Sequence, residues 1–185
     1  MSAPAPGARA PVLVLPGYAD SGPEHWQSFW ERDDPNCRRV VQDDWLEPKL
    51  GDWVAALDRA VAACAAPPVL VAHSLGCALA VRWAARPGAR ARGALLVAPA
   101  DVDSPDHTPD EVREFGPMPL EPLPFPSIVV ASTDDPFVST ARAQVFARAW
   151  GSRLVTLPAA GHVNADAGFG PWPEGRALLA QLSGA

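Results

Sequence analysis

The chain has 185 residues, a formal net charge of −6 and 48% hydrophobic residues, which describes one globular domain with enough apolar residues for a core. Acidic and basic residues are interspersed without a basic stripe, so nucleic acids and anionic membrane surfaces are not expected partners. The 22 prolines and 14 glycines are numerous, yet they stay below the share typical of low-complexity chains.

The first residues carry no signal for targeting. Residues 1–11 are rich in Ala and Pro and lack the apolar stretch of a signal peptide, and we expect residues 1–10 to be flexible. All apolar stretches are too short to cross a bilayer. Cys37, Cys64 and Cys77 show no C-x-x-C spacing, which fits a reduced protein and argues against a thiolate zinc site. We therefore expect a cytoplasmic protein.

Short Val- and Leu-rich runs alternate with segments of helical periodicity. The predicted strands are, in chain order, 12–15, 39–42, 69–73, 93–98, 128–132 and 154–157. The predicted helices are one opened by a capping box over residues 21–24, one over 49–65, one from Leu75 to the Pro87-Gly88 stop, one N-capped by Ser139 and ended by Gly151, and a last one through 178–182.

Strands that are almost entirely apolar indicate a parallel sheet covered on both faces. The sequence therefore predicts a single domain over residues 1–185, a three-layer α/β/α sandwich with about six mostly parallel strands. In such sheets the functional residues follow the carboxyl ends of the strands.

A serine in a tight turn follows the third predicted strand. Residues 72–76 read Ala-His-Ser-Leu-Gly, the G-x-S-x-G nucleophile elbow with Ala72 in place of the first glycine. The elbow needs small residues on both sides of the nucleophile because larger side chains would collide with the adjacent strand and helix. Ser74 is the predicted nucleophile, at the N-terminus of a helix whose dipole favours negative charge. An ordinary strand-to-helix turn is the alternative for this pattern taken alone.

Of the four histidines, His162 is the predicted general base because it follows the sixth strand. His73 is expected to point away from the serine hydroxyl, and His107 is expected to be solvated in a charged loop. His25 either lines the site or caps and packs the first helix. A base must be neutral to accept a proton, so activity is expected to fall once His162 is protonated.

Two adjacent aspartates follow the fifth strand. Asp135 is favoured as the acid that orients the histidine, because D-x-x-V before a small residue that opens a helix is typical of this loop. Asp134 would then be a solvated neighbour or a turn-former. The chain order Ser74, Asp135, His162 is that of α/β hydrolases.

An oxyanion hole needs two backbone N–H groups. Leu75 follows the nucleophile and supplies one, and Tyr18 supplies the other from the loop after the first strand, where Gly17 lets the backbone approach the substrate. The candidate residues of the substrate pocket are Gly17, His25, Trp26 and Asn164.

Long motifs cover nearly the whole chain. They are L-P-G-Y with E-H-W-Q-S-F-W (15–30), Q-D-D-W-L-E-P (42–48), V-A-H-S-L-G-C (71–77), S-T-D-D-P-F-V (132–138), G-H-V-N (161–164) and G-F-G-P-W-P-E-G (168–175). With these motifs the chain resembles the compact serine hydrolases of the retinoblastoma-binding protein nine or YdeN-like family, which have the α/β-hydrolase fold.

The resemblance implies hydrolysis of small carboxylic esters or amides by a Ser-Asp-His triad without a metal or cofactor. It also places the acid independently on Asp135. Some family members carry a protein-binding name, so a protein partner stays open and a non-catalytic interaction module is the alternative function. A cysteine hydrolase using Cys77 is a poorer alternative, because Cys77 lies inside the predicted helix.

Eight of the prolines fall within residues 99–127, where larger α/β hydrolases carry a cap domain. This segment is too short for such a domain. Thr108-Pro109-Asp110-Glu111 is expected to cap one short helix ending near Gly116. The sequence thus predicts a hydrolase without a cap, with a proline-stiffened loop in place of a mobile lid.

Overall fold

The computed structural model describes residues 9–183. Residues 1–8, most of the segment expected to be flexible, lie outside the described residues. Arg9 and Ala10 are held at the start of the fold, since Arg9 pairs with Asp34 and the Asn36 side chain donates to the Ala10 carbonyl.

The six strands form one sheet in which every strand is parallel to its neighbours, which confirms the predicted architecture. Its order is β2-β1-β3-β4-β5-β6. The strands are β1 (Val12–Leu15), β2 (Cys37–Arg39), β3 (Val69–His73), β4 (Gly93–Val97), β5 (Ser127–Ser132) and β6 (Arg153–Leu157). The central strands are apolar throughout because both faces of the sheet are covered.

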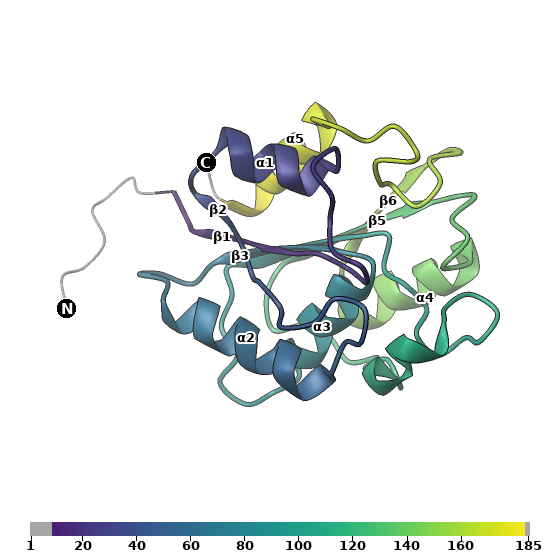
Figure 1. The fold of residues 1–185 in the computed structure, drawn as a ribbon, viewed down its shortest axis with the longest axis horizontal. Coiled ribbons are helices and arrows are strands. Elements are labelled where there is room, and N and C mark those ends of the chain that lie inside the picture. Colours follow the sequence, from purple (N-terminus) through teal and green to yellow (C-terminus); the bar gives the residue numbers. More distant parts are fainter. Residues whose placement is uncertain (1–8, 184–185) are drawn as a thin grey trace.

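Helices cover the two faces unequally (Figure 1). On one face lie α1 (Trp26–Asp33) and α5 (Pro173–Ser183), and on the other lie α2 (Leu50–Ala62), α3 (Leu75–Ala84) and α4 (Thr140–Trp150). Alternate residues of one strand serve both layers. In β3, Leu70 packs on the α2, α3 and α4 side, whereas Val71 packs on the side of α1 and α5. No helix within residues 9–183 is long and apolar enough to cross a membrane.

The second strand begins earlier than its apolar residues suggested. Residues 39–42 were predicted, but the pairing with β1 runs from Cys37 to Arg39. The N–H of Val40 still donates to the Val14 carbonyl, and Val41 is 69% exposed. At this edge of the sheet the register with β1 determines where the strand begins and ends, so the apolar residues Val40 and Val41 did not mark its bounds.

Two predicted helix caps are wrong. The first helix starts at Trp26 with His25 as its N-cap, because His25 Nδ1 accepts the Gln27 N–H, while the Ser21 hydroxyl donates to the Gln27 side chain. Thr108 does not cap the short helix either. Its hydroxyl donates to the carbonyls of residues 101 and 104. The α4 caps are confirmed: Ser139 accepts the Arg142 N–H, and Gly151 is left-handed.

The segment between β4 and β5 contains no cap domain. Its only regular element among the described residues is the 3₁₀ helix η1 (Asp110–Phe115), which ends at Gly116 as predicted. The strand order reverses between β1 and β3, since β2 lies on one side of β1 and the later strands lie on the other. Loops after β1 and β3 meet there, which is where ligands bind in open parallel sheets.

Candidate active site

Ser74 occupies the strained turn that a nucleophile elbow requires. It joins β3 to α3 with φ 53° and ψ −120°, a region that residues with a Cβ rarely adopt. Its N–H donates to the Val97 carbonyl of the neighbouring strand at 3.0 Å. Such strain persists only where the surrounding structure fixes it, and it is concentrated at functional sites.

Two glycines allow the loop after β1 to approach this turn. A Cβ on Gly76 would lie 2.2 Å from the Leu15 carbonyl oxygen, so no side chain fits there. A Cβ on Gly17 would lie 2.8 Å from the Cβ of Ser74. The small residue two positions after the serine is therefore required by the backbone of the first-strand loop.

His162 and Asp135 meet at the carboxyl ends of β6 and β5. Nδ1 of His162 lies 2.9 Å from each carboxylate oxygen of Asp135, and both residues are buried. The carboxylate also accepts the Phe137 N–H. Because an ionised carboxylate only accepts, Nδ1 is the donor in this contact. Asp134 instead accepts hydrogen bonds from Ser132 and from the Gly161 N–H.

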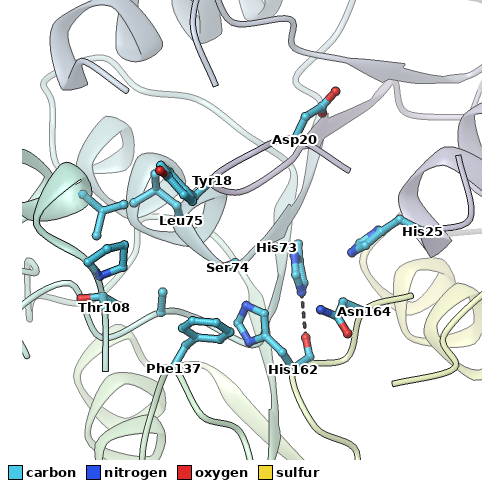
Figure 2. Close-up of a pocket in the computed structure, with 13 residues that line it drawn as sticks. Tyr18, Asp20, His25, His73, Ser74, Leu75, Thr108, Phe137, His162 and Asn164 are labelled. Atoms are coloured by element: carbon cyan, nitrogen blue, oxygen red, sulfur yellow. Dashed lines mark hydrogen bonds between the residues drawn. The ribbon is translucent and has the colours of Figure 1, made fainter. Parts of the chain in front are cut away.

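A cavity of about 330 Å³ opens over the serine. Ser74 and His162 both line it, and Figure 2 shows them near its centre. In the described part of the chain, Ser74 Oγ forms no hydrogen bond with the His162 ring. Catalytic hydrogen bonds are often long in free enzymes and shorten when substrate binds.

Two backbone N–H groups are available beside the serine. Leu75 is the first residue of α3, so its N–H has no partner within the helix. Within residues 9–183, the N–H groups of Tyr18 and Leu75 donate to no other backbone or side-chain acceptor, and both residues line the cavity. These are the two donors predicted from the sequence.

Of the four predicted pocket residues, the structure places His25 and Asn164 on the cavity wall. Gly17 packs behind the elbow, and Trp26 is fully buried, with its indole N–H donating to the Val163 carbonyl. His25 thus combines the two roles considered for it, since it lines the cavity and caps α1.

Three imidazoles lie in a row along the cavity. The ring centroids of His25 and His73 are 4.7 Å apart, as are those of His73 and His162. Burial, followed by the nearby charges of Arg39 and His162, lowers the pKa of His25 to about 3. Burial likewise holds the pKa of His73 well below its usual range. Both rings are therefore neutral near pH 7.

The sequence analysis did not assign several wall residues. They come from the loops after β1, β4 and β5 and include Asp20, Ala100, Thr108, Pro109, Val112 and Phe137. Their position after strand ends is a usable signal, but apolar and turn residues in a loop do not reveal which of them face the serine. Cys77 does not line the cavity: it is buried in α3, and burial raises the pKa of its thiol well above the usual range.

A metal site is a separate question. Within the described residues, no group of three or more His, Cys, Asp or Glu side chains is arranged to hold a metal ion.

The fold and the site together define the class of protein. A serine after β3, an acid after β5 and a histidine after β6 of a parallel sheet follow the α/β-hydrolase arrangement, and the protein has this fold. The family model described as serine hydrolase matches residues 12–181, and the chain belongs to this family.

Solved structures similar to this chain support the assignment of fold and family. A YdeN-like hydrolase from Pectobacterium atrosepticum is 38% identical, with a TM-score of 0.85 over 95% of this chain and 91% of that one. The ydeN product of Bacillus subtilis is 21% identical, with a TM-score of 0.76 over 95% of this chain and all of that one. The carboxylesterase CesB from Bacillus subtilis shares the fold at 15% identity, with a TM-score of 0.61 over 100% and 86%.

The resemblance to YdeN-like hydrolases is thereby confirmed, and the protein is a hydrolase. A search of curated proteins finds no significant match.

Proposed function

We propose that the protein hydrolyses small carboxylic esters or amides through an acyl-enzyme on Ser74. The observation that carries the proposal is the strained serine at the N-terminus of α3, which shares a cavity with His162 while His162 is bonded to Asp135. The carboxylesterase among the structural neighbours fits this chemistry.

The reaction has two steps. His162 Nε2 takes the hydroxyl proton as Ser74 Oγ bonds to the carbonyl carbon, and the protonated imidazole then gives that proton to the leaving alkoxide or amine. Water, deprotonated by the same nitrogen, next attacks the acyl carbon; the C–Oγ bond breaks, His162 returns the proton to Ser74 Oγ, and the acid is released. Asp135 fixes the tautomer through Nδ1 and stabilises the imidazolium.

The N–H groups of Tyr18 and Leu75 are placed to bind the negative oxygen that forms in both steps. They need no reorganisation, because neither donates to another acceptor in the part of the chain that the structure describes. Each such donor lowers the barrier by roughly 3 kcal/mol in enzymes of this kind.

The cavity has two chemically different sides (Figure 2). The apolar side chains of Leu75 and Phe137 lie on one side, whereas His25 and Asn164 lie on the other side. We propose that small, uncharged substrates bind here, with an apolar group toward Phe137. Because the loop after β4 contains no cap domain, no lid opening is needed for substrates to enter.

The test is labelling by a fluorophosphonate, which reacts covalently with activated serines, together with turnover of a panel of p-nitrophenyl esters and aminoacyl amides. We expect the wild type to be labelled and Ser74→Ala to be unlabelled and inactive. Ser139→Ala is the matched control, since it removes a serine hydroxyl that caps α4, and it should be labelled like the wild type.

Equal labelling of wild type and Ser74→Ala would refute Ser74 as the nucleophile. A folded wild type that neither reacts with the probe nor turns over any member of the panel would favour the interaction module instead.

A further inference from the structure

We call residues 159–163 the histidine loop. Each of these five residues forms a backbone hydrogen bond to a side chain from another part of the molecule. On its N-terminal side, three consecutive N–H groups each donate to a side chain from the end of β5. The pairs are Ala159 to Thr133 Oγ1 at 2.9 Å, Ala160 to Ser132 Oγ at 2.9 Å and Gly161 to Asp134 Oδ1 at 2.8 Å.

On its C-terminal side, two carbonyls accept from buried rings. The His162 carbonyl lies 2.8 Å from His73 Nε2, and the Val163 carbonyl lies 2.9 Å from the indole nitrogen of Trp26. Figure 2 shows the contact from His73. His73, which precedes Ser74, is thus hydrogen-bonded to the backbone of His162, the predicted general base for Ser74.

These contacts hold a conformation that the segment would not adopt alone. Ala159, Gly161 and Val163 have φ values of 46°, 52° and 49°. A β-branched residue such as Val163 is a clear outlier in this left-handed region, and strain of this kind persists only where the surroundings determine it.

Asp134 connects this loop to β5 through two hydrogen bonds of one carboxylate oxygen. Its Oδ1 accepts both the Gly161 N–H and the hydroxyl of Ser132, at 2.8 and 2.6 Å, while the Ser132 oxygen accepts the Ala160 N–H. These hydrogen bonds lower the pKa of Asp134, so it is ionised and accepting near pH 7. The carboxylate of the next residue, Asp135, forms a hydrogen bond with the ring of His162.

We propose that Asp134 is a positioning residue for His162. Adjacent carboxylates divide the work: Asp135 orients the imidazole, and Asp134 fixes the backbone from which that imidazole projects, so that the ring reaches the Asp135 carboxylate and the Ser74 hydroxyl together. Asp134 touches neither the ring nor the cavity. The proposal rests on the proposed function, since it assigns a role in the same reaction.

Asp134→Ala removes the acceptor, whereas Asp134→Asn keeps an oxygen in its place. Misplacement of a catalytic group by about 1 Å lowers rates by about 10²-fold, so we expect kcat of Asp134→Ala on a p-nitrophenyl ester to fall about 10- to 100-fold, with KM within about threefold. Asp134→Asn should recover kcat to within about threefold of the wild type.

Asp34→Ala is the matched control. Asp34 also accepts a backbone N–H, that of Asn36, but it precedes β2 and so lies at the end of the sheet opposite the site. This variant should lose thermal stability without losing kcat. A merely structural role for Asp134 would make the two alanine variants behave alike.

A second readout does not depend on turnover. Hydrogen exchange of the Ala160 and Gly161 amides should accelerate in Asp134→Ala and stay slow in Asp134→Asn. An inactive wild type with this exchange pattern would sink the proposed function alone. Wild-type kcat in Asp134→Ala, or an Asp134→Asn variant as impaired as Asp134→Ala, would overturn the positioning role.

If Asp134→Ala does not fold, Thr133→Val decides. It removes only the acceptor of the Ala159 N–H at nearly constant volume. We expect kcat to fall about threefold to tenfold, scaled down from the larger displacement, and an unchanged kcat would overturn the proposal.

Discussion

Two loops form opposite sides of the cavity and are held in different ways. The loop after β6 contributes His162 and Asn164, and its backbone bonds to side chains from β3, α1 and the end of β5. The loop after β4 contributes Thr108, Pro109 and Val112, and most of its hydrogen bonds stay within the loop itself.

Arg113 organises the second of these loops. Its guanidinium donates to the Val102 carbonyl at 2.7 Å, to the Thr108 hydroxyl at 2.6 Å and to the Ser104 carbonyl at 3.0 Å. Arg142 of α4 adds an ion pair with Asp101. The prolines restrict the intervening backbone, because each one fixes its own φ.

Because the two loops are held by different contacts, we expect the loop after β6 to govern the chemical step and the loop after β4 to govern substrate selectivity. A change in the histidine loop is transmitted to the elbow and the acid, because those elements bond to it directly. The loop after β4 is attached to the elbow and the acid loop near its start, at Ala100, Asp101 and His107, so a change in its later part acts mainly on the wall that substrates touch. We therefore expect substitutions in the first region to lower kcat and those in the second to alter KM.

The largest effect is expected from Asp135→Asn. An amide in this position donates as well as accepts, so it stabilises the wrong tautomer of His162, and kcat should fall by about 10⁴-fold with the fold intact. Steady-state kinetics on a p-nitrophenyl ester measures this loss.

Asp106→Asn is the chemically matched control, since Asp106 is exposed in the loop after β4. It should retain wild-type kcat. An Asp135→Asn variant with more than a tenth of wild-type kcat would contradict the assignment and return the choice to Asp134.

The second prediction concerns acid stability, which should be limited by the histidine side of the cavity. The pKa of His25 is lowered from 6.5 to about 3 by burial, so the unfolded chain binds a proton in this pH window that the folded chain does not. Stability from this group is complete above pH 6.5 and declines as the pH falls toward 3. One such proton amounts to about 2 kcal/mol between pH 7.5 and 5.

His25→Asn isolates this effect, because asparagine can still accept the Gln27 N–H as a helix cap. Urea unfolding at pH 7.5 and pH 5 should show a smaller loss of stability for the variant than for the wild type, by about 2 kcal/mol. Equal losses in the two proteins would show that His25 is not held neutral by the fold.

Much of the site could be predicted from the sequence, because its landmarks are local. The elbow needs small neighbours around Ser74, and a base or an acid can be found by its place after a strand. The carboxylate choice also rested on a local pattern, and the structure places the carboxylate of Asp135 against His162.

What the sequence could not show are contacts between distant residues. Trp26 and the Val163 carbonyl are 137 positions apart, and His73 is 89 positions from the carbonyl it binds. No periodicity reports a side chain bonded to a remote backbone group. Asp134 is exposed, as expected for a solvated neighbour or turn-former, but its hydrogen bond to the Gly161 N–H could not be foreseen, since Gly161 follows a different strand.

The smallest effect should come from the other wall. Arg113→Met keeps most of the side-chain volume but removes the donors to Val102, Ser104 and Thr108, so the wall that carries Thr108 and Val112 should lose order. A penalty of about 1 kcal/mol in binding corresponds to about a fivefold rise in KM, which we expect for p-nitrophenyl hexanoate. With p-nitrophenyl acetate, whose acyl group is too short to contact the wall, kcat should stay within about twofold of the wild type.

Arg148→Met is the control, since Arg148 is an exposed arginine of α4, and it should change neither the KM nor the kcat. Because the wall and the histidine loop are fixed by separate contacts, a loss of kcat on the acetate ester in folded Arg113→Met would show that the two regions are coupled.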